Sequence, residues 1–172
     1  MLIHKMGGHD ESLTKPGGET MAQTLREAAE AAMKVASGLF ETQGSVSPIW
    51  LIDTPEGNTI VHGEFTGDAS KDAIADAIRQ KFGATATRII FISEAWMREM
   101  KGPFDGIRPS EHPDRYEVIH LVAEDASGGQ LSIRRIIDRS SGTAKLLPSE
   151  VHEYQLTEGR LASFFQRANV KH

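Results

Sequence analysis

Residues 88–93 read Arg-Ile-Ile-Phe-Ile-Ser (RIIFIS), and this short stretch decides the fold. Successive side chains of a β-strand point to opposite faces of its sheet, and here both alternating sets are apolar. A strand with two apolar faces is typical of the middle of a sheet that is covered on both sides. The stretch therefore predicts a central strand with helices flanking its sheet.

A long helical pattern lies upstream, beginning at Met21 and ending at Gly44. Thr20 or Thr24 is expected to cap its first turn, because both have side chains that can accept a backbone N–H. Its apolar residues recur at the i, i+3, i+4 spacing of one helical stripe. They are Leu25, Ala28, Ala29, Ala32, Met33, Ala36, Leu39 and Phe40.

Between this helix and the central strand, the pattern predicts a hairpin and a second helix. The hairpin strands are expected at Val46–Asp53 and Thr59–Phe65, joined by residues 54–58, whose Pro and Gly suit a tight turn. The second helix is expected at Asp68–Phe82, where the apolar residues again share one face.

Downstream of the central strand, three further strands and one helix are expected. Gly-containing turns separate the strands, which favours an antiparallel meander. His120, in one of these strands, is interpreted as a hydrogen-bonded strand histidine rather than a base. The strands are Tyr116–Glu124, Gln130–Asp138 and Thr143–Leu147, and the helix is Glu158–Ala168 with Leu161, Phe164 and Phe165 facing inward.

The order of elements is then helix, strand, strand, helix, four strands, helix (αββαββββα). This order predicts an α+β fold with a mixed, largely antiparallel sheet of about six strands flanked by three helices. Residues 21–172 are expected to form a single domain. Residues 1–20 are rich in Gly and polar residues, so we expect a flexible N-terminal tail.

Composition narrows the function classes. The chain has no cysteine, so no thiolate-bound metal is possible, and its cofactors are otherwise unknown. The net charge of −5 does not indicate nucleic acid as a partner. No stretch is apolar for long enough to suggest a membrane span or a signal peptide, so a cytoplasmic protein is expected.

The polar stretch from Ser93 to Glu117 is the candidate binding region. Loops at strand ends commonly carry function, because a rigid sheet positions side chains that have no packing role. One interpretation is a Pro-stiffened connection whose charges pair with one another and whose Trp covers the core edge. The alternative is a contact surface for a second copy (a homodimer) or another protein. The candidate residues are Glu94, Trp96, Arg108, Glu111, His112, Asp114 and Arg115.

A second hypothesis is a metal-dependent hydrolase. His62, Glu64, His112 and Asp114 offer imidazole and carboxylate groups, which suit zinc, manganese or iron and would activate a bound water. It requires the hairpin and the central strand to end on the same side of the sheet. Otherwise His62 and Glu64 simply lie on the solvent face of an edge strand.

Two resemblances accompany these patterns. The segments SEAWM (93–97) and RPSEHPDRYE (108–117) resemble uncharacterised bacterial and archaeal proteins of unknown function. That resemblance implies only a prokaryotic protein of unknown function. A binding or regulatory role is expected instead from the Trp, Met and Arg content of residues 93–115, since these residue types favour interface cores. The order helix, hairpin, helix, strand, with His62-Gly63-Glu64 after the hairpin, is similar to the cytidine deaminase-like fold, in which His-x-Glu supplies a zinc ligand and the general acid/base. Ser93-Glu94-Ala95-Trp96 stands where that family has Pro-Cys-x-x-Cys, so the family's usual zinc site cannot form. The resemblance then implies a degenerate deaminase-like enzyme with a His/carboxylate site.

Overall fold

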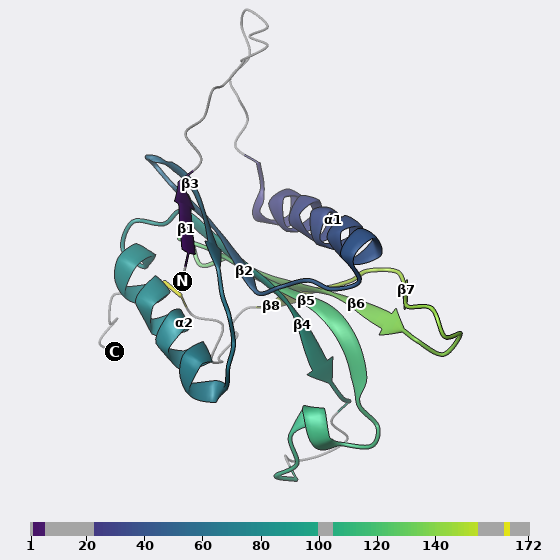
Figure 1. Cartoon of the computed structure of the whole chain (residues 1–172). Helices are drawn as coiled ribbons and strands as arrows, with labels where there is room; N and C mark the ends of the chain where they lie inside the picture. The colour runs from purple at the N-terminus through teal and green to yellow at the C-terminus, as the bar shows by residue number, and fades with distance from the viewer. Residues whose placement is uncertain (1, 6–22, 100–104, 155–163, 166–172) are drawn as a thin grey trace, which may run out of the picture.

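The computed structural model describes residues 2–5, 23–99, 105–154 and 164–165, and it is an α+β fold built on one antiparallel sheet (Figure 1). The strand order is β1-β3-β2-β4-β5-β6-β7, with β8 also beside β6, and every described pair is antiparallel. The strands are β1 (Leu2–Lys5), β2 (Ile49–Thr54), β3 (Gly57–His62), β4 (Arg88–Met97), β5 (Tyr116–Asp125), β6 (Gln130–Asp138), β7 (Lys145–Leu146) and β8 (Glu150–Tyr154). The largely antiparallel sheet is confirmed, but its mixed character is not.

Two helices, α1 (Leu25–Gln43) and α2 (Asp68–Phe82), pack on opposite faces of this sheet (Figure 1). The central position of residues 88–93 is confirmed. Ile90 and Ile92 join the core under α1, while Ile89 and Phe91 join the core under α2. The two helices are offset: α1 contacts β4, β5 and β6, whereas the core under α2 is formed with β2, β3 and β4. Part of each sheet face therefore lies beyond its helix.

The ends of α1 follow from local chemistry. Thr24, one of the two predicted caps, accepts the Glu27 backbone N–H at 3.2 Å, and the Glu27 carboxylate accepts the Thr24 N–H at 2.9 Å. This reciprocal pair is a capping box, which satisfies two N–H groups that the first helical turn leaves unpaired. At the other end, Gly44 adopts φ 78°, a left-handed conformation that a side chain disfavours.

The N-terminal prediction needs correction. Leu2–Lys5 lie in the predicted flexible tail, yet they form β1 and pair with β3, with Ile3 opposite Val61. The prediction averaged the composition of residues 1–20 and so overlooked Leu2 and Ile3, which favour a strand. The backbone hydrogen bonds of this strand are made with β3, which is distant in sequence. The rest of that predicted tail, residues 6–20, lies outside the described residues.

The C-terminal elements also differ from expectation. The part of the chain that the structure describes has two α-helices, not three: Phe164 and Phe165, inside the predicted helix Glu158–Ala168, are not helical. The other residues of that predicted helix lie outside the described ranges. Phe164 nevertheless faces inward, at 1% exposed, and its N–H donates to the Glu124 carboxylate at 3.0 Å. Strand β8 was not predicted, because its polar sequence becomes a strand only by pairing with β6.

Strand β4 is longer than predicted. It continues past Ser93 to Met97, paired throughout with β5, so part of the predicted 93–117 loop is strand. A short 3-10 turn, η1 (Pro109–Glu111), lies in what remains of the loop. No helix among the described residues is long and apolar enough to cross a membrane.

We predict opposite effects for two Gly-to-Ala substitutions. A methyl group at Gly63 would lie 2.6 Å from the ring of the fully buried Trp50, so Gly63→Ala should lower the free energy of unfolding by about 1–3 kcal/mol. Gly38, inside α1, has open space around it, so Gly38→Ala should raise that free energy by about 0.5–1 kcal/mol. Urea denaturation of both variants measures the two effects. Equal changes would contradict the tight packing of Gly63 on Trp50.

Candidate functional site

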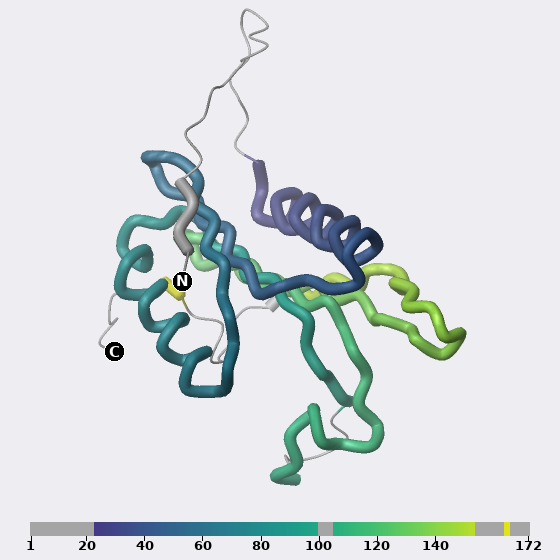
Figure 2. Tube along the Cα trace, in the orientation of Figure 1, coloured from purple at the N-terminus to yellow at the C-terminus, as the bar shows by residue number. Residues whose placement is uncertain are grey.

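The β4–β5 hairpin forms an arm that projects beyond the rest of the sheet (Figure 2). Strand β2 pairs with β4 only as far as Ile92, whereas β5 follows β4 to Met97. Beyond Ile92, no described strand lies on the β2 side of β4. We call residues 93–99 and 105–117 the arm. It contains all seven residues of the predicted binding region.

Trp96 is the most exposed aromatic ring of the arm. It is 44% exposed and does not belong to either core cluster, so it does not cover the core edge as one interpretation required. The Arg115 guanidinium lies 4.9 Å from the Trp96 ring centroid, and Arg115 also donates to the Ser110 carbonyl at 2.7 Å. The cation–π contact and this hydrogen bond hold the ring in place while leaving part of it in solvent.

Glu94 has a structural contact at the base of the arm. Its carboxylate accepts the backbone N–H of Val46 at 2.5 Å and so ties β4 to the connection between α1 and β2. Beside it, Arg139 donates to the Glu117 carboxylate at 2.7 Å. These contacts hold the arm to the body of the domain.

The far end of the arm is held by an ion pair between Arg98 and Asp105. The Arg98 side chain is only 5% exposed, and its Nη1 donates to Asp105 at 2.6 Å. This hydrogen bond, together with the N–H of Ile107, lowers the pKa of Asp105 well below its usual range. His112 Nε2 lies 3.9 Å from the same carboxylate, and His112 Nδ1 accepts the Asp114 N–H at 3.1 Å. His112 therefore helps to shape the turn.

The remaining predicted residues face outward. Arg108 is exposed and lies 3.4 Å from Asp68 in the first turn of α2, so the end of the arm reaches the second helix. Glu111, in η1, is exposed. The seven residues thus share the arm, but they do not converge on one pocket: Arg115 lies over the Trp96 ring, and His112 accepts the Asp114 N–H.

The metal hypothesis gains no geometric support. His62 and Glu64 are exposed at and after the end of β3. Within the described residues, no group of three or more His, Asp or Glu could hold a metal ion. His62, Glu64, His112 and Asp114 therefore do not form the expected site. Strand β3 is also not an edge strand, because β1 pairs with its outer side.

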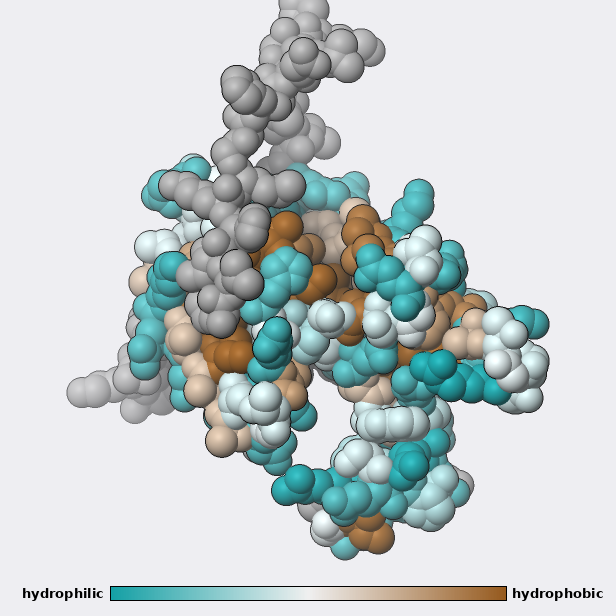
Figure 3. All heavy atoms as spheres, in the orientation of Figure 1, coloured by the Kyte–Doolittle hydropathy of each residue, from teal (hydrophilic) through white to brown (hydrophobic). Residues whose placement is uncertain are grey.

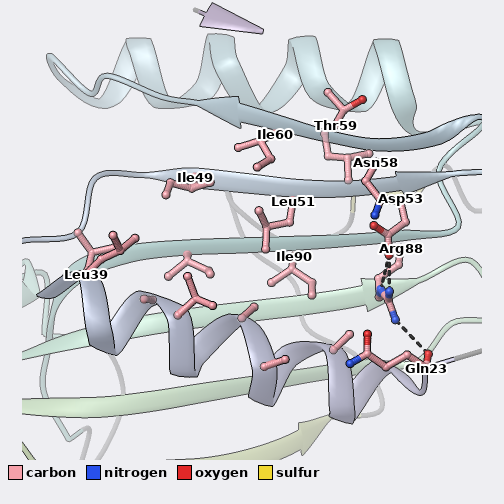
Figure 4. Close-up of a pocket in the computed structure, with 18 residues that line it drawn as sticks. Gln23, Leu39, Ile49, Leu51, Asp53, Asn58, Thr59, Ile60, Arg88 and Ile90 are labelled. Carbon is pink, nitrogen blue, oxygen red and sulfur yellow. Dashed lines mark hydrogen bonds and ion pairs between the residues drawn. The ribbon is translucent and has the colours of Figure 1, made fainter. Parts of the chain in front are cut away.

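A site that the sequence did not predict lies on the α1 face, where the offset of the helix leaves β2 and β3 uncovered. It is a cavity of about 390 Å³ between α1 and the sheet, which we call the α1 groove (Figure 4). Figure 3 shows apolar side chains gathered in this hollow. Its lining is mostly apolar: Ala28, Ala31, Ala32, Val35, Ala36 and Leu39 from α1, and Val46, Ile49, Leu51, Ile60, Ile90 and Ile92 from the other side.

One end of the α1 groove is polar (Figure 4). Arg88 donates through Nε to the Asp53 carboxylate at 2.7 Å and through Nη1 to the Gln23 carbonyl at 3.1 Å. Asn58 and Thr59 complete this end. The sequence signal for the groove was an excess of apolar residues: Ala31 and Val35 are exposed although they continue the helical stripe.

Comparison with known proteins identifies no relative. No protein family, curated protein or solved structure matches the chain. Functional inference therefore rests on the geometry of the arm and the groove.

We predict that His120 makes the stability depend on pH. Burial, together with the charges of Arg134 and His152, lowers its pKa to about 4, so the folded chain keeps His120 neutral. In the unfolded chain a histidine titrates near pH 6.5. Between these values the unfolded state binds the extra proton, so stability is fully present above about pH 6.5 and is lost as the pH falls toward 4.

Urea denaturation of the parent and His120→Gln proteins at pH 7 and pH 5 tests this dependence. The parent should lose about 2 kcal/mol more than the variant over this interval. The same loss in both proteins would show that His120 is not the responsible group.

Proposed function

We propose that this domain is a binding module that recognises a protein partner through the arm. The observation that supports it best is Trp96, which Arg115 holds in place although 44% of it is exposed. Tryptophan and arginine are enriched among the residues that dominate binding energy at protein interfaces. The partner is either a second copy of the chain or a different protein.

The energy available from Trp96 is substantial. A buried tryptophan removes up to about 250 Å² from water, so the exposed 44% corresponds to roughly 110 Å². At about 25 cal/mol per Å², covering this area contributes approximately 2.7 kcal/mol. Because Arg115 already restrains the ring, less side-chain entropy is lost on binding than for a freely rotating tryptophan.

The open edge of β4 supports the same proposal. Backbone N–H and C=O groups of an unpaired strand edge can pair with an incoming strand, which is a common way of binding extended peptides. Residues 93–97 have β5 on one side and no described strand on the other. An added strand here would place its alternate side chains beside Trp96.

We predict that Trp96→Ala weakens partner binding at least about tenfold, which corresponds to about 1.4 kcal/mol, and Arg115→Ala weakens it less. Because both side chains lie outside the core clusters, the thermal stability of the two variants should stay close to that of the parent. Arg26→Ala is the matched control, since Arg26 is an exposed arginine that pairs with Glu30 and Glu153 far from the arm in sequence.

Two measurements read out this prediction. Sedimentation velocity over a concentration series detects self-association, and a photo-crosslinking amino acid at the exposed Ile107 captures other partners in cells. The expected result is an assembly or a crosslink that Trp96→Ala removes and Arg26→Ala retains. A monomer at all concentrations, combined with crosslinks that are unchanged by Trp96→Ala, would refute the proposal.

A further inference from the structure

The α1 groove has one wall that carries no charge over the length of the helix. Val35 is 65% exposed and Ala31 is also exposed, one turn away, while Leu39 is partly buried another turn on. Three charged residues of this helix, Glu30, Lys34 and Glu41, lie on its other flank. Surface helices normally place charged residues opposite their core face, so this exposed apolar wall is not explained by folding alone.

The floor of the groove is equally apolar. Ile49 and Leu51 of β2 and Ile60 of β3 point to the α1 side of the sheet, and all three are partly exposed (Figure 4). Antiparallel strands with one solvated face alternate polar and apolar side chains. Here β2 does not alternate, since Trp50 and Ile52 on its other face are buried. This floor therefore has the composition of a covered surface.

The dimensions of the groove fit a single alkyl chain. Ala28 and Leu39 are separated by eleven residue steps along α1, which is about 16 Å at 1.5 Å per step. Dividing the volume of about 390 Å³ by that length gives a mean cross-sectional area of roughly 24 Å², which accommodates one hydrocarbon chain. At about 30 Å³ for each water-sized group, the groove holds roughly a dozen such groups.

The polar end selects the head group of the ligand. Arg88 and Asp53 neutralise each other, and Arg88 makes a further hydrogen bond to the Gln23 carbonyl. A carboxylate head group would be repelled by Asp53, because Arg88 is already paired with that carboxylate. An ammonium head group would be repelled by Arg88 for the same reason. An uncharged head that both donates and accepts hydrogen bonds suits the side chains of Asn58 and Thr59 at this end.

We propose that the α1 groove binds a neutral single-chain amphiphile, such as a long-chain alcohol or amide of roughly ten to twelve carbons. The chain lies along α1 over β2 and β3, and the head group lies beside Asn58 and the Arg88–Asp53 pair. The site is independent of the arm, so its success or failure does not decide the proposed function.

The test uses probes that share one chain and differ in their head group. Decan-1-ol, decanamide, decanoate and decylammonium are titrated, below their aggregation concentrations, into protein with isotope-labelled Ile, Leu and Val methyl groups. The alcohol and the amide should shift the methyl signals of Val35, Leu51 and Ile60, and should bind at least about tenfold more tightly than the two ions. Among alcohols, affinity should rise roughly fourfold per methylene until the groove is full.

Two substitutions locate the binding site. Val35→Glu places a charge in the groove wall at an exposed position, so the protein should remain folded while affinity falls at least about tenfold. Lys34→Gln changes the net charge by the same amount on the opposite flank of the helix and should leave affinity unchanged. A thermal melt of each variant checks folding.

Three results would overturn the proposal. One is the absence of methyl shifts with any probe. Another is equal affinity for the neutral and charged heads, which would indicate an unselective apolar surface. The third is a dimer that Val35→Glu dissociates without any probe binding, which would assign the groove to a second copy of the chain.

Discussion

The two apolar faces of β4 are the constraint on which the rest of the structure depends. Ile89 and Phe91 point to one side and Ile90 and Ile92 to the other, and all four are buried. Burying a side chain of this size contributes about 1.5–3 kcal/mol, so neither face can be left in water. One helix cannot cover both faces, so α1 and α2 pack on opposite sides. Their offset leaves β2 and β3 bare on one side and creates the α1 groove.

Elements that are determined by residues within one short segment could be predicted from the sequence. The core face of α1, its Thr24 cap and its Gly44 end follow from spacing and backbone chemistry within one segment. The bounds of α2 follow in the same way, and so does the hairpin of β2 and β3, although its strands are Ile49–Thr54 and Gly57–His62 rather than the predicted Val46–Asp53 and Thr59–Phe65. Elements that depend on distant pairing were not predictable, and β1 and β8 are the examples: each is short, and each exists because a strand far along the chain provides its hydrogen bonds.

The same distinction between local sequence and distant contacts applies to the candidate sites. Residues of the arm could be named from sequence, because polar residues and a tryptophan after a strongly apolar strand are visible as a pattern. Their individual roles could not, since the contacts of Glu94 with Val46 and of Arg108 with Asp68 join segments far apart in the chain. The groove was missed because each of its walls looks like ordinary core. Only the relative placement of α1 and β2 shows that the two walls do not meet.

The pairing of β1 also has a kinetic consequence. Leu2 lies opposite His62, so the ribosome adds sixty further residues after Leu2 before its partner residue is synthesised. At synthesis rates of about 5–20 residues per second, β1 stays without β3 for roughly 3–12 s. The β4–β5–β6 meander, by contrast, closes through neighbouring segments. Strand β1 is therefore expected to join the sheet later than these neighbouring strands pair with one another.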